Sequence, residues 1–418
     1  MTLPTSRDRR RVLGTITALV LLAAWLVGLG ARHPAAAGQQ PASAAARLVP
    51  ERSRVAGMPP ELRERVAATP MAFFRFVNAA WTREVCEAFR IETRQLPTAR
   101  LHGDAHVEQY AVTATARGLD DFDDSARGPA VIDLVRFLGS LELAAAQRGW
   151  AGALPATIDA FFDGYRRALE DPSYTPPDPA VVKRLRGAPQ KSPSAFLSWA
   201  DSLMQPLTAN DQANLHTTWA RVVASASRTA PEFTRAFMTL KRVGWLRTGI
   251  GSALTRKLLI RVEGPSPALD DDVVLEAKQV GAFQSDSCVS VPRRSEAFRV
   301  VEGIKQIGRL QPSFVVALPG IEDSRPDTPD WWAKTWDRSY QEVEIAALDS
   351  PEDLQELARD AGAQLGSTNL PERTGGPEGQ NRLIELQAIV RLESRIRDLA
   401  HDLTTALLQA WKEFRVSS

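Results

Sequence analysis

The stretch LHGDAHVEQYAVTATARGLDDFDDSARGPAVIDLVRFLGSL, residues 101–141, decides the prediction of both fold and site. It contains two of the chain's five histidines, His102 and His106. It also contains six aspartates: Asp104, Asp120, Asp121, Asp123, Asp124 and Asp133. Carboxylates and imidazoles are the side chains that transfer protons and bind metals. We therefore expect the functional site to be built around this stretch.

The order of these residues indicates a division of labour. A carboxylate on a tight loop accepts a proton from a hydroxyl, and a second carboxylate one hairpin later holds a divalent cation. In phosphoryl transfer by kinases, an amide side chain five residues after the first Asp also binds metal, and the second Asp belongs to a D-F-x triplet. The matching positions are Asp104, Gln109 and Asp121. His106 is a second catalytic candidate, and Asp123 is a further metal ligand.

These motifs resemble the catalytic segment of the aminoglycoside phosphotransferase and choline kinase branch of the kinase superfamily. That branch has H-G-D-x-H-x-x-N, then a D-F-[DE] triplet, then a D-L pair on a helix. The chain has LHGDAHVEQ, DDFDD and Ile132-Asp133-Leu134 in the same order. The resemblance implies that Asp133 braces the catalytic loop. The chain departs from the pattern at Gln109, whose amide reaches one methylene further than that of the family's Asn.

A kinase also needs a glycine-rich loop, a lysine for the phosphates and a glutamate that holds the lysine. These features are expected after the catalytic loop in this chain. Gly249, Gly251 and Ser252 precede a predicted strand, Lys278 ends a second one, and Glu302 lies on the predicted helix that follows. Glycines let backbone amides approach phosphate, and the lysine meets its charge. We expect ATP and magnesium as cofactors and a small molecule as phosphoryl acceptor.

The chain as a whole looks like an uncharacterised bacterial family, the domain of unknown function 2252. The resemblance spans about residues 60–370 and rests on TPMAFFR at 69–75, LHGDAH, DDFDDSARGP, TGIGSALTR, LEAKQ and RVVEGIK. The family pattern has glycine where the chain has Phe76. No established activity comes with this resemblance. Its motif order implies a kinase-like fold in circularly permuted order.

Two other functions use the same residues differently. H-x-D-x-H is also a spacing of metal ligands, because alternate residues of an extended segment face one side. His102, Asp104 and His106, with Asp121 or Asp123, then form a zinc or manganese site for hydrolysis. A kinase-like module that binds without catalysis is the third hypothesis, favoured by Gln109.

The N-terminus has the pattern of an export signal. Four arginines between positions 7 and 11 precede an apolar run at 12–31, and Ala35–Ala37 offers a cleavage site. The run is also long enough to anchor the chain in a bilayer. We therefore expect an exported protein, periplasmic or extracellular, or one anchored in the inner membrane with its body outside the cytoplasm. Outside the cytoplasm Cys86 and Cys288 are able to pair, although two buried thiols fit the sequence equally well. The net charge of +1 gives no reason to expect nucleic acid as a partner.

The hydrophobic periodicity predicts an α+β fold that is mainly helical, with a kinase-like bilobal arrangement. We expect a signal peptide or membrane anchor at 1–37 and a linker at 38–60. A helical lobe is expected at 61–242, and it includes residues 102–109, which we call the catalytic-type loop. A β-rich region resembling a nucleotide lobe is expected at 243–345, and C-terminal helices at 346–418. Three- and four-residue apolar spacing gives the helices, and short runs such as LLIRV and VVLEA give the strands.

Overall fold

The computed structural model describes residues 43–416, apart from 51–54, 56, 95, 172, 230–238, 247–255, 265, 267, 282, 284–285, 292–294, 319–329 and 369–377. The described chain is an α+β protein that is mainly helical, as predicted. The signal or anchor expected at 1–37 lies outside the described residues. Among the residues that are described, no helix is both long and apolar enough to span a bilayer.

Five antiparallel strands form the main sheet, in the order β5-β6-β7-β9-β8. Their bounds are Leu240–Trp245 (β5), Lys257–Val262 (β6), Val273–Val280 (β7), Val315–Leu318 (β8) and Asp330–Thr335 (β9). Side chains alternate between the two faces of a strand. Leu275 and Ala277 of β7 therefore join an apolar cluster with Trp219 of α10 (Ala209–Thr229). Glu276 and Lys278 point to the opposite face.

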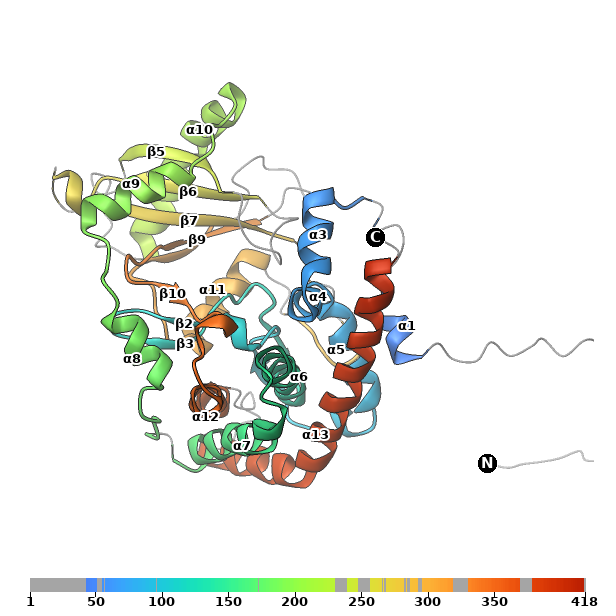
Figure 1. The fold of residues 1–418 in the computed structure, drawn as a ribbon. Coiled ribbons are helices and arrows are strands. Elements are labelled where there is room, and N and C mark those ends of the chain that lie inside the picture. Colours follow the sequence, from blue (N-terminus) through green and yellow to red (C-terminus); the bar gives the residue numbers. More distant parts are fainter. Residues whose placement is uncertain are drawn as a thin grey trace, which may run out of the picture. The chain divides into compact units, whose positions relative to one another are not determined.

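That opposite face is only partly covered by helices. Helix α11 (Glu296–Ile307) packs against Val280 and Trp332, and α9 (Pro193–Leu203) packs against Val274. Figure 1 places α10 and α11 on opposite sides of the sheet. The part of the face between α9 and α11 remains available for polar side chains.

The helical part surrounds the long apolar helix α6 (Val131–Arg148), 14 of whose residues are buried. Helix α7 (Leu154–Glu170) packs extensively against α12 (Pro351–Thr368), and the C-terminal helix α13 (Glu378–Val416) packs against α6 (Figure 1). The helical part also contains α3 (Pro60–Ala68), α4 (Pro70–Phe76), α5 (Asn78–Ala88) and α8 (Ala180–Gly187).

The central stretch forms two small antiparallel sheets. Strand β1 (Ala99–Leu101) pairs with β4 (Ala126–Gly128), so the segment between them closes into one loop region. Strand β2 (Tyr110–Val112) pairs with β3 (Arg117–Leu119) on one side and with β10 (Gln341–Glu342) on the other. Because β10 follows β9 after a short connection, the main sheet is joined to the hairpin that follows the catalytic-type loop.

The linker expected at 38–60 is in part structured, which corrects that prediction. Residues Ala44–Leu48 form helix α1, which packs against α13. Leu48 is fully buried in the core of the helical part, and Arg47 pairs with Glu84 of α5. Because the segment is rich in alanine, its sequence does not indicate that Leu48 is buried.

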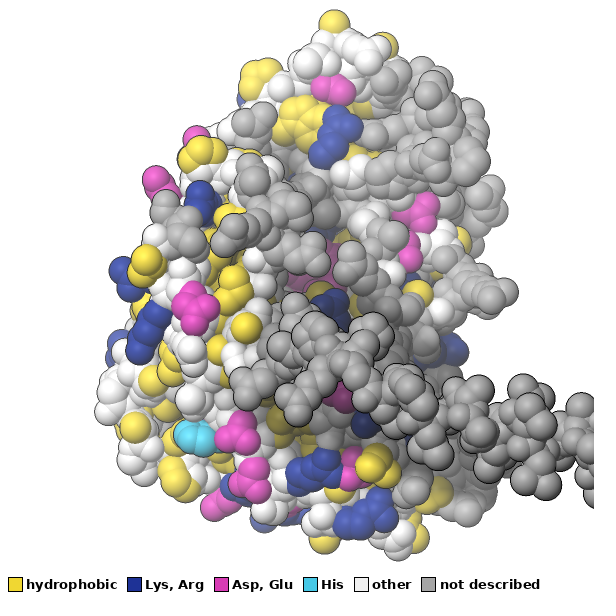
Figure 2. Space-filling model, turned by 90° about the vertical axis from the view of Figure 1, so that its right-hand side faces the viewer, with side chains coloured by type: hydrophobic (Ala, Val, Ile, Leu, Met, Phe, Trp, Pro, Cys, Tyr) yellow, Lys and Arg dark blue, Asp and Glu magenta, His cyan; other side chains and the backbone are white. Residues whose placement is uncertain are grey.

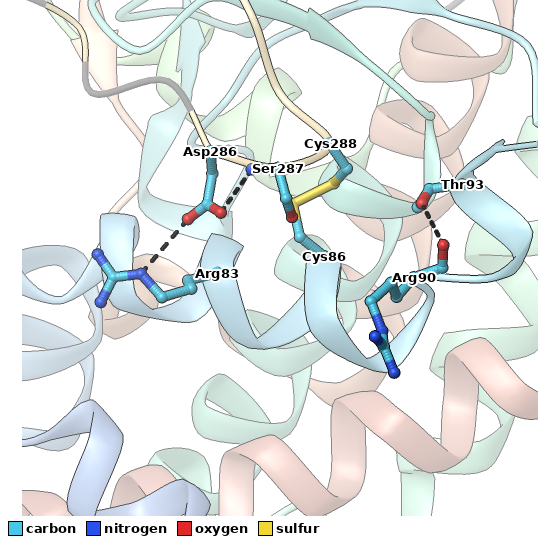
Figure 3. The surroundings of a disulfide bond; sticks show 7 residues. All are labelled: Arg83, Cys86, Arg90, Thr93, Asp286, Ser287 and Cys288. Atoms are coloured by element: carbon cyan, nitrogen blue, oxygen red, sulfur yellow. Dashed lines mark hydrogen bonds and ion pairs between the residues drawn. A yellow bond between two sulfur atoms is a disulfide. The ribbon is translucent and has the colours of Figure 1, made fainter. Parts of the chain in front are cut away.

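A disulfide joins Cys86 and Cys288, whose Cα atoms lie 5.5 Å apart. Cys86 lies on α5, and Cys288 lies in the segment that leads from the sheet to α11 (Figure 3). Asp286 in the same segment lies 3.4 Å from the guanidinium of Arg83, one turn before Cys86 (Figure 3). The bond therefore connects the helical part to the segment before α11, and it resolves the two possibilities for the cysteines in favour of pairing.

Candidate functional site

The loop at 102–106 is held by a buried carboxylate. The two oxygens of Asp133, at the start of α6, accept hydrogen bonds from the backbone N–H groups of His102 at 2.8 Å and Gly103 at 2.9 Å. Gly103 has a φ of +85°, and a Cβ on it would come within 1.8 Å of the carbonyl oxygen of Asp124. Only glycine fits this position. The brace expected at Asp133 is therefore present.

Both ring nitrogens of His102 form hydrogen bonds with backbone groups. Its Nε2 lies 2.9 Å from the carbonyl oxygen of Asp120, and its Nδ1 accepts a bond from the N–H of Asp104. The ring also packs against Phe122, at 4.8 Å between centroids. His102 thus fixes the loop to the acidic segment that follows the hairpin.

Asp104 forms a buried ion pair. Its Oδ1 accepts bonds from Nε and Nη2 of Arg136, at 2.9 and 2.7 Å, and His106 lies 3.5 Å from its Oδ2. Burial alone raises the pKa of this carboxyl, but Arg136 and His106 outweigh burial and lower the pKa to about 2. Burial lowers the pKa of His106, which packs against Phe74. Asp104 is therefore ionised, while His106 is buried and neutral near pH 7.

The acidic turn, which we define as residues 120–124, has a constrained backbone. Asp121 has a φ of +61°, the left-handed region that few residues other than glycine adopt. The next residue, Phe122, is buried in an apolar cluster with Val300 and Ile304 of α11. Packing of Phe122 against α11 thus holds Asp121 in an unfavourable conformation, which is typical of functional sites.

Lys278 joins the main sheet to this turn. Its Nζ lies 3.0 Å from Oδ1 of Asp121 and also pairs with Asp123. Burial lowers the pKa of this lysine, but the charges of Asp121 and Asp123 outweigh burial and raise that pKa above its usual value. Burial raises the pKa of Asp121, but Lys278 and Lys257 hold it well below its usual range. With 39% of its side chain exposed, Asp121 remains accessible to a ligand.

A pocket of about 870 Å³ opens beside this ion pair. Its charged and amide side chains include those of Gln109, Asp120, Asp121, Lys257, Glu276, Lys278 and Lys334, and Asp270, Asp271 and Asp272 also line it. Its apolar side chains include those of Phe196, Leu197, Leu246, Val274 and Trp336. Residues of the connection between β9 and β10 line it as well. A pocket of this size that is lined by both charged and apolar groups fits a drug-sized ligand that carries both kinds of group.

The structure brings together some of the predicted site residues. Gln109, Asp121 and Lys278 line the pocket, and Asp123 pairs with Lys278. Asp104 and His106 are not among the lining residues, and Asp104 contacts both Arg136 and His106. Gly249, Gly251 and Ser252 lie outside the described residues. The carboxylate of Glu302 lies 3.9 Å from Arg100, while Lys278 has the aspartates of the turn as its partners.

Two lysines that line the pocket, Lys257 and Lys334, were missed by reasoning from the sequence. Lys257 stands opposite Lys278 in the register of β6 and β7, and Lys334 stands opposite Glu276 in that of β7 and β9. Lys334 also binds Asp120 at 2.7 Å. In the sequence, Lys257 begins the run KLLIRV and Lys334 lies in DWWAKT, so each lysine stands next to apolar residues of a strand. This pattern becomes informative only when the pairing of the strands is known.

The hydrolase alternative requires three ligands that converge. Among the described residues, no group of three or more histidine, cysteine, aspartate and glutamate side chains is arranged to hold a metal ion.

On the face drawn in Figure 2, basic and acidic side chains of the described residues are interspersed, without a broad patch of one sign.

Residues 54–193 match the model of a family described as "Uncharacterized protein conserved in bacteria (DUF2252)". The match supports the family expected from the motifs. It includes the catalytic-type loop, the acidic turn and Asp133, and it ends before the main sheet. Neither the curated proteins nor the solved structures include one that matches the chain.

Proposed function

We propose that this DUF2252-like chain binds a nucleoside triphosphate with magnesium in the pocket between its main sheet and the acidic turn, as a kinase-like protein does. One observation carries the proposal: Lys278 of the sheet meets Asp121 of the turn at 3.0 Å beside an 870 Å³ pocket. A strand lysine and a D-F-x aspartate are the two parts that bind phosphate and metal in protein kinases.

The donor set of the pocket fits magnesium. Carboxylate and amide oxygens are the ligands that this ion prefers, and Asp121, Asp123 and Gln109 offer them. Magnesium bound there would neutralise the charge on the phosphates. Lys278 balances the carboxylates of Asp121 and Asp123. With magnesium held by these carboxylates, the lysine would be available to bind the phosphates.

The lining of the pocket suits both parts of a nucleotide. Lys257, Lys278 and Lys334 would contact the phosphates, and magnesium would offset the carboxylates beside them. Trp336 and Phe196 offer aromatic surface for a base. An extended ligand with an aromatic group and several phosphates would use both kinds of side chain, whereas a free phosphate would use only the charged ones.

Phosphoryl transfer to a small molecule is the reaction that we propose for this site. The Asp104 carboxylate would accept a hydrogen bond from the acceptor hydroxyl and orient it. Arg136 supports this role because it keeps Asp104 ionised. A pKa of about 2 makes Asp104 a weak base, so its proposed contribution is orientation more than early removal of the proton.

Thermal unfolding with and without ligand tests the proposal. We expect ATP with MgCl2 to raise the melting temperature of the wild type, and Asp121→Ala to abolish that increase. Asp402→Ala, at an exposed position on α13, is the control and should respond like the wild type. No response of the wild type to ATP, combined with stabilisation by Zn²⁺, would favour the hydrolase. Binding of ATP without turnover of any acceptor would favour the non-catalytic module.

We further propose that the body of the protein lies outside the cytoplasm. The disulfide supports this location, because such bonds persist in oxidising compartments. Fusion of alkaline phosphatase to the C-terminus in a bacterial host should give an active phosphatase, which requires export. An inactive phosphatase together with a fluorescent fusion of green fluorescent protein would contradict export.

A further inference from the structure

Helix α11 contacts the acidic turn through a buried arginine. Nη1 of Arg299 donates to the carbonyl oxygens of Asp123 at 2.6 Å and of Ser125 at 2.7 Å. Only 7% of Arg299 is exposed. The two carbonyls lie on either side of Asp124, so one guanidinium fixes the path of the backbone where the turn ends.

The orientation of this guanidinium is itself fixed. Nε of Arg299 donates to Oε2 of Glu296, one turn earlier on the same helix, at 2.6 Å. The ion pair and the two carbonyl bonds use different edges of the planar group. A lysine would offer one ammonium in place of this rigid fork and would not satisfy all three acceptors in the same geometry.

Helix α11 also packs against the turn and the residue that follows it at two further places. A Cβ at Gly303 would lie 2.5 Å from Oγ of Ser125, so glycine permits the close approach. Ser125 in turn donates to the carbonyl oxygen of Leu101, just before the catalytic-type loop, at 3.0 Å. Phe122 is buried in the α11 cluster. The turn therefore cannot shift without moving the helix.

The coupling differs from the arrangement expected from the motifs. A helix glutamate was expected to hold the lysine, but Glu302 lies 3.9 Å from Arg100 and Lys278 binds the turn directly. Arg299 therefore supplies the charged link between α11 and the acidic turn in the described structure.

We infer that Arg299 is a positioning residue that sets the Asp121 and Asp123 carboxylates for a divalent cation, so that α11 determines the metal affinity of the pocket. The inference rests on the proposed function, because it assumes that the turn binds a cation. Residues that orient metal ligands typically change metal affinity by about 10- to 100-fold when they are replaced.

Binding of Mn²⁺ to the purified protein, followed by electron paramagnetic resonance, tests the inference. We expect Arg299→Gln to weaken Mn²⁺ binding by about 10- to 100-fold, and Arg299→Lys to lie between this variant and the wild type. Arg184→Gln is the matched control. Arg184 also binds a carboxylate and a carbonyl, those of Asp353 and Ala347, but it does not line the pocket. This control should lose thermal stability without losing Mn²⁺ affinity.

Each outcome separates the two claims. If the wild type does not bind Mn²⁺, the proposed function fails for the metal, and the inference fails with it. If the wild type binds Mn²⁺ and both Arg299 variants bind it as tightly as the wild type does, only the inference is overturned. If Arg299→Gln does not fold, Arg299→Lys decides: affinity equal to that of the wild type overturns the inference. Weaker binding by Arg299→Lys, with an unchanged melting temperature, supports it.

Discussion

The ammonium group of Lys278 lies 3.0 Å from a carboxylate oxygen of Asp121, although 157 residues separate them in the chain. The lysine belongs to the central strand of the main sheet, and the aspartate belongs to the turn that α11 holds in place. Their contact joins two distant segments of the chain. The stability of the folded protein should therefore depend on both charges.

Replacement of Lys278 by Met should destabilise the protein in a pH-dependent way. The pKa of Asp121 is held low in the folded state, so its pairing contributes stability above the unfolded pKa near 4, and this contribution is lost on acidification. The variant lacks that contribution. We expect a loss of about 2 kcal/mol at pH 8, reduced from the value for a fully buried pair by the exposure of Asp121, and a smaller loss at pH 2, because the contribution disappears only as the pH falls below about 4.

Urea unfolding at the two pH values measures this effect, with Lys412→Met at an exposed position of α13 as the control. An equal loss of stability at pH 8 and pH 2 would show that packing, and not charge, accounts for the role of Lys278.

Replacement of Asp133 by Ala should damage the catalytic-type loop. Two backbone N–H groups, the buried one of His102 and the partly buried one of Gly103, would lose their acceptors. Each unsatisfied buried donor costs about 1–3 kcal/mol, so we expect the free energy of unfolding to fall by roughly 2–6 kcal/mol. Calorimetry compares the variant with Asp402→Ala. A melting temperature equal to that of the wild type would mean that the loop does not need the brace.

Reduction of the disulfide between Cys86 and Cys288 should lower the stability of the chain. The bond closes a loop with a sequence separation of 202 residues, and disulfides typically contribute about 2–4 kcal/mol. We expect a phosphine reductant to lower the melting temperature of the wild type and to leave Cys86→Ser/Cys288→Ser unaffected. A similar decrease in the double variant would assign the effect to the reagent.

Glu385 should make stability fall as pH rises toward neutrality. It is 2% exposed on α13, and burial raises its pKa to about 7 even though Tyr165 donates to it at 3.1 Å. The folded state therefore holds a proton that the unfolded state releases near pH 4.5. Stability is lost between about pH 4.5 and 7, by roughly 3 kcal/mol, and stays constant above that range.

Glu385→Gln keeps an acceptor for Tyr165 and has no proton to release. The variant should match the wild type at pH 4.5 and exceed it in stability at pH 8, with exposed Glu413→Gln unchanged at both. Denaturant unfolding across this range measures the slope. Parallel curves for Glu385→Gln and the wild type would assign the pH dependence to another group.

Much of the site follows from local sequence. The segment LHGDAH carries a glycine that the left-handed backbone and the close approach of Asp124 require. Asp133 stands at the start of an apolar helix, where its carboxylate reaches the loop. The strands around LLIRV and VVLEA, and the helices that follow, obey the two- and 3.6-residue periods that short-range geometry imposes. These features depend on neighbours along the chain.

Other features depend on how the segments pack. Asp104 pairs with Arg136 because α6 packs behind the loop. Strand β2 pairs with β10 as well as with β3, although β10 follows the main sheet in the chain. The pairing of Cys86 with Cys288 and the stretch at 330–335 as an interior strand of the main sheet were also left open by the sequence.

The sequence by itself predicted the parts of the candidate site: a braced loop, an acidic turn and a strand lysine. The tertiary structure decided which of them meet. Strand register places Lys278, Lys257 and Lys334 on one face, and the packing of α11 brings the acidic turn against it. The physical reason is that backbone periodicity is set within a few residues, whereas a contact between distant side chains depends on the packing of the whole core.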